Sequence, residues 1–311
     1  MMVKRTTRVH FIMKNKNTEF QKSVNISDCE KFESQYTIVT TFNKLEANSK
    51  YTLDIYLDNQ KLKKSYEFNT LSKDSIKDFS FLIGSCLFLP PKLLNPIYPG
   101  NEDGILASMN KTESDFMLWL GDNIYYPLTI NKTKTMHRIY TKYRKNKRLQ
   151  KFMSSRPQFS TWDDHDYGRN NSRSEFELKE HSLHVHKNFW ANPYYGEKDN
   201  KGVYNHFRYY DAEFIFLDGR FHASREKNKQ TLMGQEQLIW FKNRIENSKA
   251  SYIFVINGIQ TLNLNCKYEC YERLYKEEYK QLKKIINNKK GTHFMFLTGD
   301  RHFSELISDT L

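Results

Sequence analysis

Five short and almost uninterrupted apolar segments constrain the fold of this 311-residue chain more than any other feature. They are FSFLI (79–83), DFMLWL (115–120), EFIFLD (213–218), YIFVI (252–256) and HFMFLT (293–298). Such runs are typical of strands that are buried on both faces of a sheet. The stretches between them suit amphipathic helices, at about 102–113, 133–152, 174–190, 234–247 and 270–288. The pattern therefore predicts an α/β layered domain.

The first 76 residues show a different periodicity. QYTIVTTF (35–42) and KYTLDIYLD (50–58) alternate apolar and polar side chains, and SYEFNT (65–70) follows a polar turn. Alternation with a period of two predicts strands with one buried face, and no helical periodicity competes with it. We therefore predict a small β-sandwich-like domain over 1–76 and a larger domain over 77–311.

The charge of the chain is strongly positive, at +13, and much of it lies in the segment 132–151. A charged helix face that is simply solvated is the plainer interpretation of this segment. The alternative is a surface that attracts phosphate-bearing molecules or holds a polyanion. No apolar run approaches the roughly 20 residues that span a bilayer, and the basic N-terminus has no apolar signal core.

Polar residues follow the predicted strands directly. They form five clusters: GSC (84–86), GDNIY (121–125), WDDHDYG (162–168), Asp218 with Arg220, and GDRH (299–302). The carboxyl ends of parallel strands meet at one edge of a sheet, where ligands bind in α/β folds. Carboxylates at the end of a buried strand are costly unless they are paired or bound to metal. The pattern predicts a metal site at this edge.

The side chains in these clusters suggest the kinds of metal. Asp122 follows a glycine and can bridge two cations, although a turn aspartate is the alternative. Three aspartates surround His165 and would repel one another without a cation or an arginine. Cys86 is either a small buried apolar residue or a thiolate ligand. Thiolate and phenolate together favour Fe(III), and the oxygen-rich part of the site suits Ca, Mg or Mn.

Three further histidines, at 181, 184 and 186, lie as close together in the sequence as metal ligands often do. On a helix the first two share a face and the third does not, and no strand end lies beside them in the sequence. We therefore interpret this segment as a solvated helix.

The motifs resemble one known family when they are taken in order. GSC, LGDNIY, WDDHD followed by Tyr-Gly and an Asn pair, LDGR, G-x-x-Q-x-x-W and GDRHFSEL resemble the alkaline phosphatase D (PhoD-like) family, which is related to purple acid phosphatases. The resemblance covers most of 79–305. It implies a four-layer αββα metallophosphoesterase domain preceded by a small all-β (immunoglobulin- or fibronectin-like) domain. It also implies Fe(III) and Ca, with Mg, Mn or Zn as substitutes for Ca.

The resemblance also implies roles for individual residues. Iron would be held by Cys86, Asp122, Tyr125 and His302. Asp122 would bridge to the second ion, whose other ligands would be Asp164 and Asp300, with Asn170 or Asn171 completing its shell. His165 and Arg220 would be the catalytic groups. The residues that bind substrate would be Asn123, His165 and Arg220.

The implied activity is the hydrolysis of phosphate esters, as an alkaline phosphatase or phosphodiesterase, by a metal-bound hydroxide that attacks phosphorus. Nucleic acid would then be a partner only as a substrate. Two alternatives stay open: a non-catalytic polyanion- or nucleic-acid-binding protein, and a truncated, inactive phosphoesterase. The second arises because the chain ends at Leu311, nine residues after His302, whereas the family usually continues through further strands. Family members are often exported.

Overall fold

The structure is a computed structural model that describes residues 6–32, 35–72, 77–89, 102–228, 230–263 and 268–308. The chain divides into two compact units, Met1–Asp78 and Phe79–Leu311.

The first unit is built from antiparallel strands. Its main sheet has the order β2-β1-β5-β6, with β7 also paired to β5: β1 (Arg8–Lys14), β2 (Glu19–Asn25), β5 (Lys50–Leu57), β6 (Gln60–Lys61) and β7 (Tyr66–Asn69). A short 3-10 turn, η1 (Ile26–Asp28), leads to the hairpin of β3 (Lys31–Phe32) and β4 (Gln35–Tyr36). Tyr51 is fully buried and stacks on Phe68 with ring centres 5.7 Å apart.

The strand predicted over 35–42 is mostly not formed. Only Gln35–Tyr36 of this segment pairs with a neighbouring strand. The central strand β5 already pairs with β1 on one side and with β6 and β7 on the other. The residues 37–42 that follow Tyr36 pair with none of the described strands, and alternation alone does not create a hydrogen-bonding partner.

The second unit contains two sheets. The first is fully parallel, in the order β10-β9-β8: β8 (Phe81–Gly84), β9 (Phe116–Leu120) and β10 (Gln158–Thr161). The second has the order β11-β12-β13-β14: β11 (Asn205–Tyr209), β12 (Ala212–Phe216), β13 (Tyr252–Asn257) and β14 (His293–Thr298). All five predicted apolar segments contain strands. The antiparallel β11 was not predicted.

Burial on both faces explains the apolar runs of β9 and β12, whereas β8 and β14 carry exposed residues on one face. Along β9, Phe116, Leu118 and Leu120 pack into the cluster between the two sheets, where Phe214 of β12 also lies. The alternate residues Met117 and Trp119 belong to the cluster on the opposite face. Because both faces are covered, no position of such a strand can be polar without a cost.

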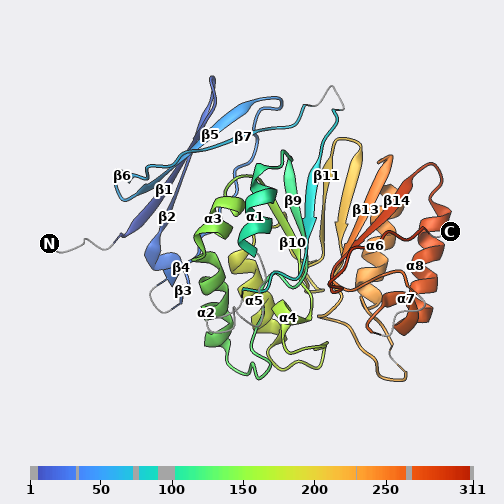
Figure 1. Ribbon diagram of the computed structural model, residues 1–311. Coiled ribbons are helices and arrows are strands. Elements are labelled where there is room, and N and C mark those ends of the chain that lie inside the picture. The colour runs from blue at the N-terminus through green and yellow to red at the C-terminus, as the bar shows by residue number, and fades with distance from the viewer. Residues whose placement is uncertain are drawn as a thin grey trace. The chain divides into compact units, whose positions relative to one another are not determined.

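Helices cover the outer face of each sheet (Figure 1). Those beside the parallel sheet are α1 (Glu102–Lys111), α2 (Thr133–Arg144), α3 (Lys147–Met153) and α5 (Lys179–Phe189). Those beside the second sheet are α6 (Gln235–Asn247), α7 (Tyr271–Leu274) and α8 (Lys276–Asn288). The α/β class predicted from the sequence is confirmed. Within the described parts of the chain, no helix is both long and apolar enough to span a bilayer.

Two expected helices are each divided into two. The helix predicted over 133–152 is interrupted at Asn146, whose side chain accepts hydrogen bonds from the backbone N–H groups of Arg148 and Leu149 at 3.0 and 3.1 Å. This N-cap starts α3 as a separate helix. The helix predicted over 270–288 is interrupted at Tyr275, whose φ of −128° and ψ of 49° are not helical.

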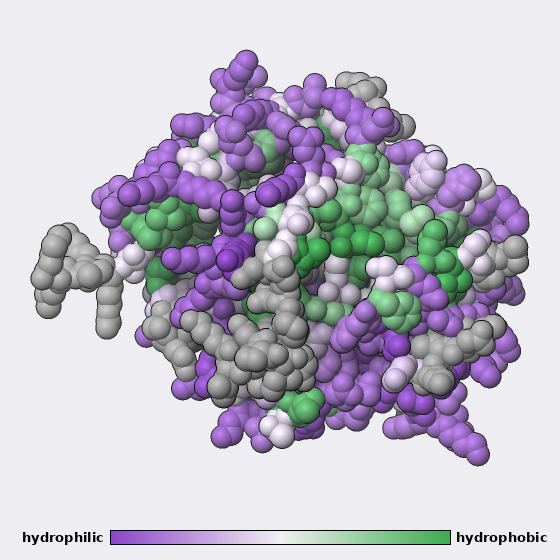
Figure 2. Space-filling model, in the orientation of Figure 1, coloured by the Kyte–Doolittle hydropathy of each residue, from purple (hydrophilic) through white to green (hydrophobic). Residues whose placement is uncertain are grey.

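An apolar groove of about 1160 Å³ runs beside the outer strands of the two sheets. Figure 2 shows hydrophobic side chains gathered over β13 and β14 on the face turned to the viewer. The exposed apolar residues that line the groove include Ile83 of β8 and Met295 of β14, at 48% and 49% exposed. Among the described strands, β8 and β14 each have one partner and form one edge of their sheets.

The packing between the sheets generates a stability prediction. Phe214 is fully buried and contacts four phenylalanine rings, from Phe81, Phe116, Phe207 and Phe254, at 4.9–5.3 Å between ring centres. We expect Phe214→Ala to lower the free energy of unfolding by about 3–5 kcal/mol in urea denaturation. The matched control Ile239→Ala, on α6 and 43% exposed, should change it by no more than about 0.5 kcal/mol. Equal effects of the two variants would contradict the proposed core.

Candidate active site

The backbone turns sharply where three strands end. Cys86 after β8, Asp122 after β9 and Asp300 after β14 have positive φ angles of 57°, 53° and 66°. This left-handed conformation is uncommon for residues other than glycine and costs free energy. Three such turns at one edge of the unit point to a site where side-chain direction matters more than local stability.

Glycines allow the strand ends to approach one another. Gly121, with φ of +89°, has no room for a side chain, because an added Cβ would lie 2.7 Å from the Cβ of Asp163. A Cβ on Gly299 would overlap the carbonyl oxygen of Leu120. In the Gly-Asp pairs at 121–122 and 299–300, the glycine thus allows two backbone segments to pass close together. The aspartate places a carboxylate just beyond that point.

Asp122 lies at the centre of the site and is 2% exposed. Its Oδ1 accepts a hydrogen bond from the backbone N–H of His165 at 3.2 Å, and its Oδ2 accepts one from the Tyr125 hydroxyl at 3.3 Å. The Cys86 sulfur donates to the same Oδ2 at 3.7 Å. Burial, together with the charges of Asp164 and Asp166, raises the pKa of Asp122 well above its ordinary value.

Cys86 and Tyr125 share this burial. It raises the pKa of the Cys86 thiol to about 12 and that of the Tyr125 hydroxyl above its usual value, with Asp122 adding to both shifts. Each group therefore holds its proton unless a cation replaces it.

Asp164 is the first residue of the short helix α4 (Asp164–Tyr167) and is 4% exposed. Its Oδ2 accepts a hydrogen bond of 2.6 Å from the backbone N–H of Asn171. Burial alone would raise the pKa of Asp164, but Arg220, 4.0 Å away, and His165 hold it below its ordinary value. Asn171, one of the two asparagines expected to complete the calcium shell, thus contacts this carboxylate through its backbone N–H.

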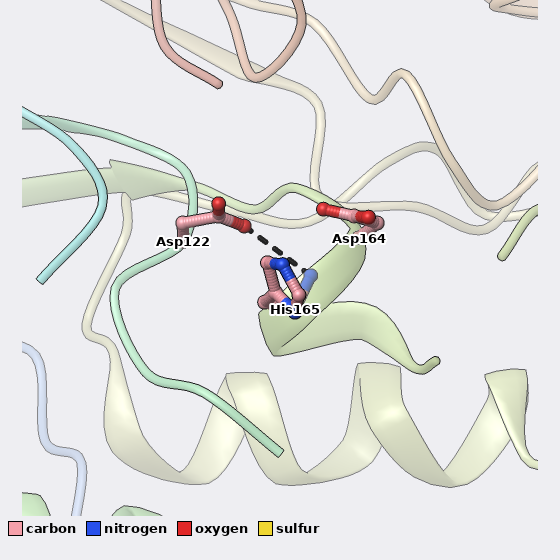
Figure 3. Close-up of side chains that lie close together, drawn as sticks. All are labelled: Asp122, Asp164 and His165. Atoms are coloured by element: carbon pink, nitrogen blue, oxygen red, sulfur yellow. Dashed lines mark hydrogen bonds between the residues drawn. The ribbon is translucent and has the colours of Figure 1, made fainter. Parts of the chain in front are cut away.

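Figure 3 shows the carboxylates of Asp122 and Asp164 facing each other, with His165 beside them. One ligand atom from each of these three residues lies within 4.8 Å of the others. Carboxylates this close repel each other unless a cation lies between them, and their oxygen atoms suit hard divalent ions. The residues present therefore fit a metal site. Asp300 and the exposed His302 line the same cavity, whose volume is about 670 Å³.

The ring of His165 lies against that of Tyr125, with ring centres 4.4 Å apart and the planes tilted by 31°. Burial lowers the pKa of His165, and Asp164 offsets part of that effect. The imidazole is therefore neutral near pH 7 and has one N–H to donate.

Arg220 lies beside the carboxylates of the site, and its direct contact with phosphate stays a prediction. It is 2% exposed, and its Nε and Nη1 donate to Asp163 at 2.6 Å and to Glu269 at 2.8 Å. Burial alone would lower the pKa of Arg220, but the neighbouring carboxylates of Asp163 and Glu269 raise it well above its ordinary value. The guanidinium therefore holds carboxylates in place, because its Nε and Nη1 already face Asp163 and Glu269.

Asn123 also lies beneath the site, at 1% exposed. Its Nδ2 donates to the backbone oxygen of Thr161 and to Asp166 Oδ2, both at 2.7 Å. Asp166 in turn accepts the backbone N–H of Asp163 at 2.6 Å, and burial raises its pKa to about 7. These contacts join β9 to the start of α4, and contact between Asn123 and substrate stays a prediction.

Two carboxylates of the site were not given a role by the sequence. Glu269 pairs with Arg220 and Arg173, and nothing in its local sequence marks it. Asp218 is fully buried, and its Oδ1 accepts hydrogen bonds from Trp162 Nε1 and from the backbone N–H of Arg220. Its place at the end of an apolar strand was the available signal. The spacing of Cys266 and Cys270 in the sequence allows a local disulfide, with two free thiols as the alternative, and Cys266 lies outside the described residues.

Comparison with known proteins decides the family. The sequence model of the PhoD-like phosphatases matches residues 98–308, which is more than half of the chain. The chain belongs to the PhoD-like phosphatase family. A solved structure of PhoD resembles it with a TM-score of 0.76 at 18% sequence identity, over 97% of this chain and 66% of the PhoD chain. This PhoD-like chain thus spans just under two thirds of the length of that relative.

A purple acid phosphatase from yellow lupin (Lupinus luteus) seeds is also similar, with a TM-score of 0.49 and 11% identity over 81% of this chain and 46% of the plant enzyme. No curated protein sequence matches this chain. Membership of a phosphatase family, together with the group of Asp122, Asp164 and His165, supports a metal cofactor in the PhoD-like unit.

The electrostatics of the PhoD-like site generate a pH prediction. The folded-state pKa of Asp122 is raised, so its stabilising contribution is complete at acid pH and is lost as pH rises through that folded-state pKa. In chelated, metal-free protein we expect the Tm to fall as pH rises above about 4, the ordinary pKa of an aspartate, and added Mn²⁺ to remove the fall.

Differential scanning calorimetry of the same chelated protein provides the controls. Asp122→Asn should flatten the slope of Tm against pH, whereas Asp28→Asn, in the exposed turn η1, should keep the slope of the unmodified chain. A slope that is the same in all three proteins would show that Asp122 is not a source of the pH dependence.

Proposed function

We propose that the protein hydrolyses phosphate esters, as an alkaline phosphatase or phosphodiesterase. One observation carries the proposal: in a chain of a phosphatase family, Asp122, Asp164 and His165 converge at an open cavity beside the strand ends. Buried carboxylates that repel one another are costly to keep, and their function as metal ligands explains that cost.

The ligands divide into two groups. Cys86, Tyr125 and His302 with Asp122 would hold Fe(III), since a thiolate and a phenolate suit a redox-capable ion. Asp164 and Asp300, with Asp122 as the bridge, would hold Ca, or Mg, Mn or Zn in its place. Such ions, when bound, lower the pKa of water and neutralise the charge that grows on phosphate oxygens.

His165 acts on the group that departs. Its ring lies beside Asp122 and lines the cavity, so that its N–H can face the oxygen that leaves phosphorus. The pKa of His165 is low in the free protein because of burial, and the negative charge of a bound phosphate would raise it. The imidazole then donates its proton to the leaving oxygen.

Basic side chains favour an anionic substrate. The arginines that line the cavity are Arg173, Arg225, Arg273 and Arg301. Arg220 acts indirectly: its ion pair with Asp163 fixes the turn from which Asp164 and His165 project.

The architecture completes the proposal. The finer arrangement is a four-layer αββα metallophosphoesterase domain over 77–311, preceded by an immunoglobulin- or fibronectin-like domain over 1–76. The two sheets with helices on their outer faces, and the antiparallel sheet of the first unit, support it.

A polyanion-binding function is the second candidate. In α2 and α3 the exposed residues include Lys134, Arg138, Lys142, Lys147 and Lys151, and neither helix contains an acidic residue. This function predicts salt-sensitive binding that a chelator does not change, whereas hydrolysis depends on metal.

The first experiment measures the hydrolysis of bis-p-nitrophenyl phosphate by protein supplied with Fe and Ca. We expect activity that disappears with chelator and returns on addition of metal. Asp122→Asn should abolish turnover and leave the circular dichroism spectrum unchanged, and Asp28→Asn should keep full activity. Full activity of folded Asp122→Asn protein would refute the proposal.

A second measurement isolates the role of His165. A leaving alkoxide needs a proton more than p-nitrophenolate does, so His165→Asn should lower kcat for an alkyl phosphate ester by about 10²–10⁴-fold. Its effect on the p-nitrophenyl ester should be much smaller. His222→Asn is the matched control, since His222 Nε2 bonds the backbone oxygen of Lys201. Equal losses for both esters would assign His165 to binding and not to proton transfer.

A further inference from the structure

Three histidines meet where α2 packs against α5, in the outer helix layer of the larger unit. His137 lies on α2, and His181 and His184 lie on α5. Their ring centres are 5.3 Å apart for His137 and His181, 6.2 Å for His137 and His184, and 5.9 Å for His181 and His184. Sequence spacing alone places His181 and His184 on one face of a helix. The fold brings His137, which lies 44 residues before His181 in the chain, beside them.

The spacing of the rings is close to what a shared ion requires. Zn–N bonds of about 2.0–2.1 Å in tetrahedral geometry place imidazole ring centres about 5 Å apart. The ring nitrogens do not converge in this structure as closely as the ligand atoms of Asp122, Asp164 and His165 do. Binding a shared ion would require these rings to turn, and His184 is exposed while His181 is half-buried.

We propose that His137, His181 and His184 form a second metal site, which binds Zn²⁺ or a similar borderline divalent ion and joins α2 to α5. The donors are three imidazoles with no carboxylate among them, a set that suits zinc, nickel or copper better than calcium or magnesium. Water would take the remaining position.

The state of His137 agrees with this role. The residue is 2% exposed, and burial, with His181 and His184, lowers its pKa to about 3. The ring is therefore neutral at physiological pH, as a metal ligand must be. His184 Nε2 lies 3.1 Å from Asn188 Nδ2, a contact that an ion bound through this nitrogen would replace. Exposed charges such as Arg138 on α2 oppose a cation but are screened by solvent.

The site is separate from the strand-end cavity, since none of its ligands lines that cavity. The histidine site is nevertheless connected to that cavity through α5 and α4. Ser182, between two of the ligands, donates a hydrogen bond of 2.5 Å to the backbone oxygen of Tyr167 in α4. An ion that fixes α5 against α2 would therefore stabilise the layer that supports α4. The proposal does not depend on phosphatase activity.

Titration with Co²⁺ tests the proposal, because tetrahedral cobalt absorbs visible light far more strongly than cobalt held by six oxygen ligands. In an Asp122→Asn, Asp164→Asn background, which weakens the other site, we expect one equivalent of Co²⁺ to produce the tetrahedral spectrum. Zn²⁺ should abolish that spectrum and raise the Tm. Adding His181→Gln and His184→Gln should remove both effects, and His293→Gln, an exposed histidine, should remove neither.

An unchanged cobalt spectrum and zinc response in the His181→Gln, His184→Gln protein would overturn the proposal, as would the absence of both in the parent. A second measurement uses the unmodified chain and so does not depend on the folding of any variant. Zn²⁺ should slow the reaction of diethylpyrocarbonate with His181 and His184 at least tenfold, measured by peptide mass, with no slowing at His293. Equal rates with and without Zn²⁺ would also overturn it.

Discussion

A buried guanidinium organises the site of this protein. Arg220 is 2% exposed and pairs with Asp163 on one side and Glu269 on the other, with Asp164 at 4.0 Å. Three segments far apart in the sequence thus meet at one positive charge. Removing one partner of such a group leaves the others as uncompensated buried charges, at a cost of about 3–5 kcal/mol. The geometry of the strand ends depends on this balance of charge.

Backbone strain and buried charge both make the metal-free site unfavourable. The left-handed turns at Cys86, Asp122 and Asp300 cost stability, and so does the burial of Asp122 beside Asp164. The extensive aromatic packing between the two sheets, centred on Phe116 and Phe214, supplies a rigid base that can hold such turns. A site that is unfavourable when empty binds cations more favourably, because the cation relieves the repulsion.

Much of the fold was predictable because the strands of the larger unit read as apolar runs, with β9 and β12 buried on both faces. The strand β11 was missed because NHFRY is short and alternates weakly, and it pairs antiparallel at the outer edge of its sheet. The break at Asn146 was missed because helical periodicity continues across it, and only the capping hydrogen bonds mark a new start. The alternation over 35–42 predicted a strand, but only Gln35–Tyr36 pairs with a described neighbour.

The sequence by itself determined which side chains lie at the strand ends, because a Gly-Asp pair after an apolar run marks a turn with a carboxylate beyond it. It could not determine which way a side chain faces once the sheets have packed. Only the tertiary structure placed Arg220 beside the carboxylates, added Glu269 as its second partner, and brought His137 to His181 and His184. The interpretation of 181–186 as a solvated helix was also wrong for His186, which is fully buried against Ser160 and Tyr140. The spacing of residues along one helix or strand determines which of them lie on the same face. The residues against which that face packs come from another part of the chain.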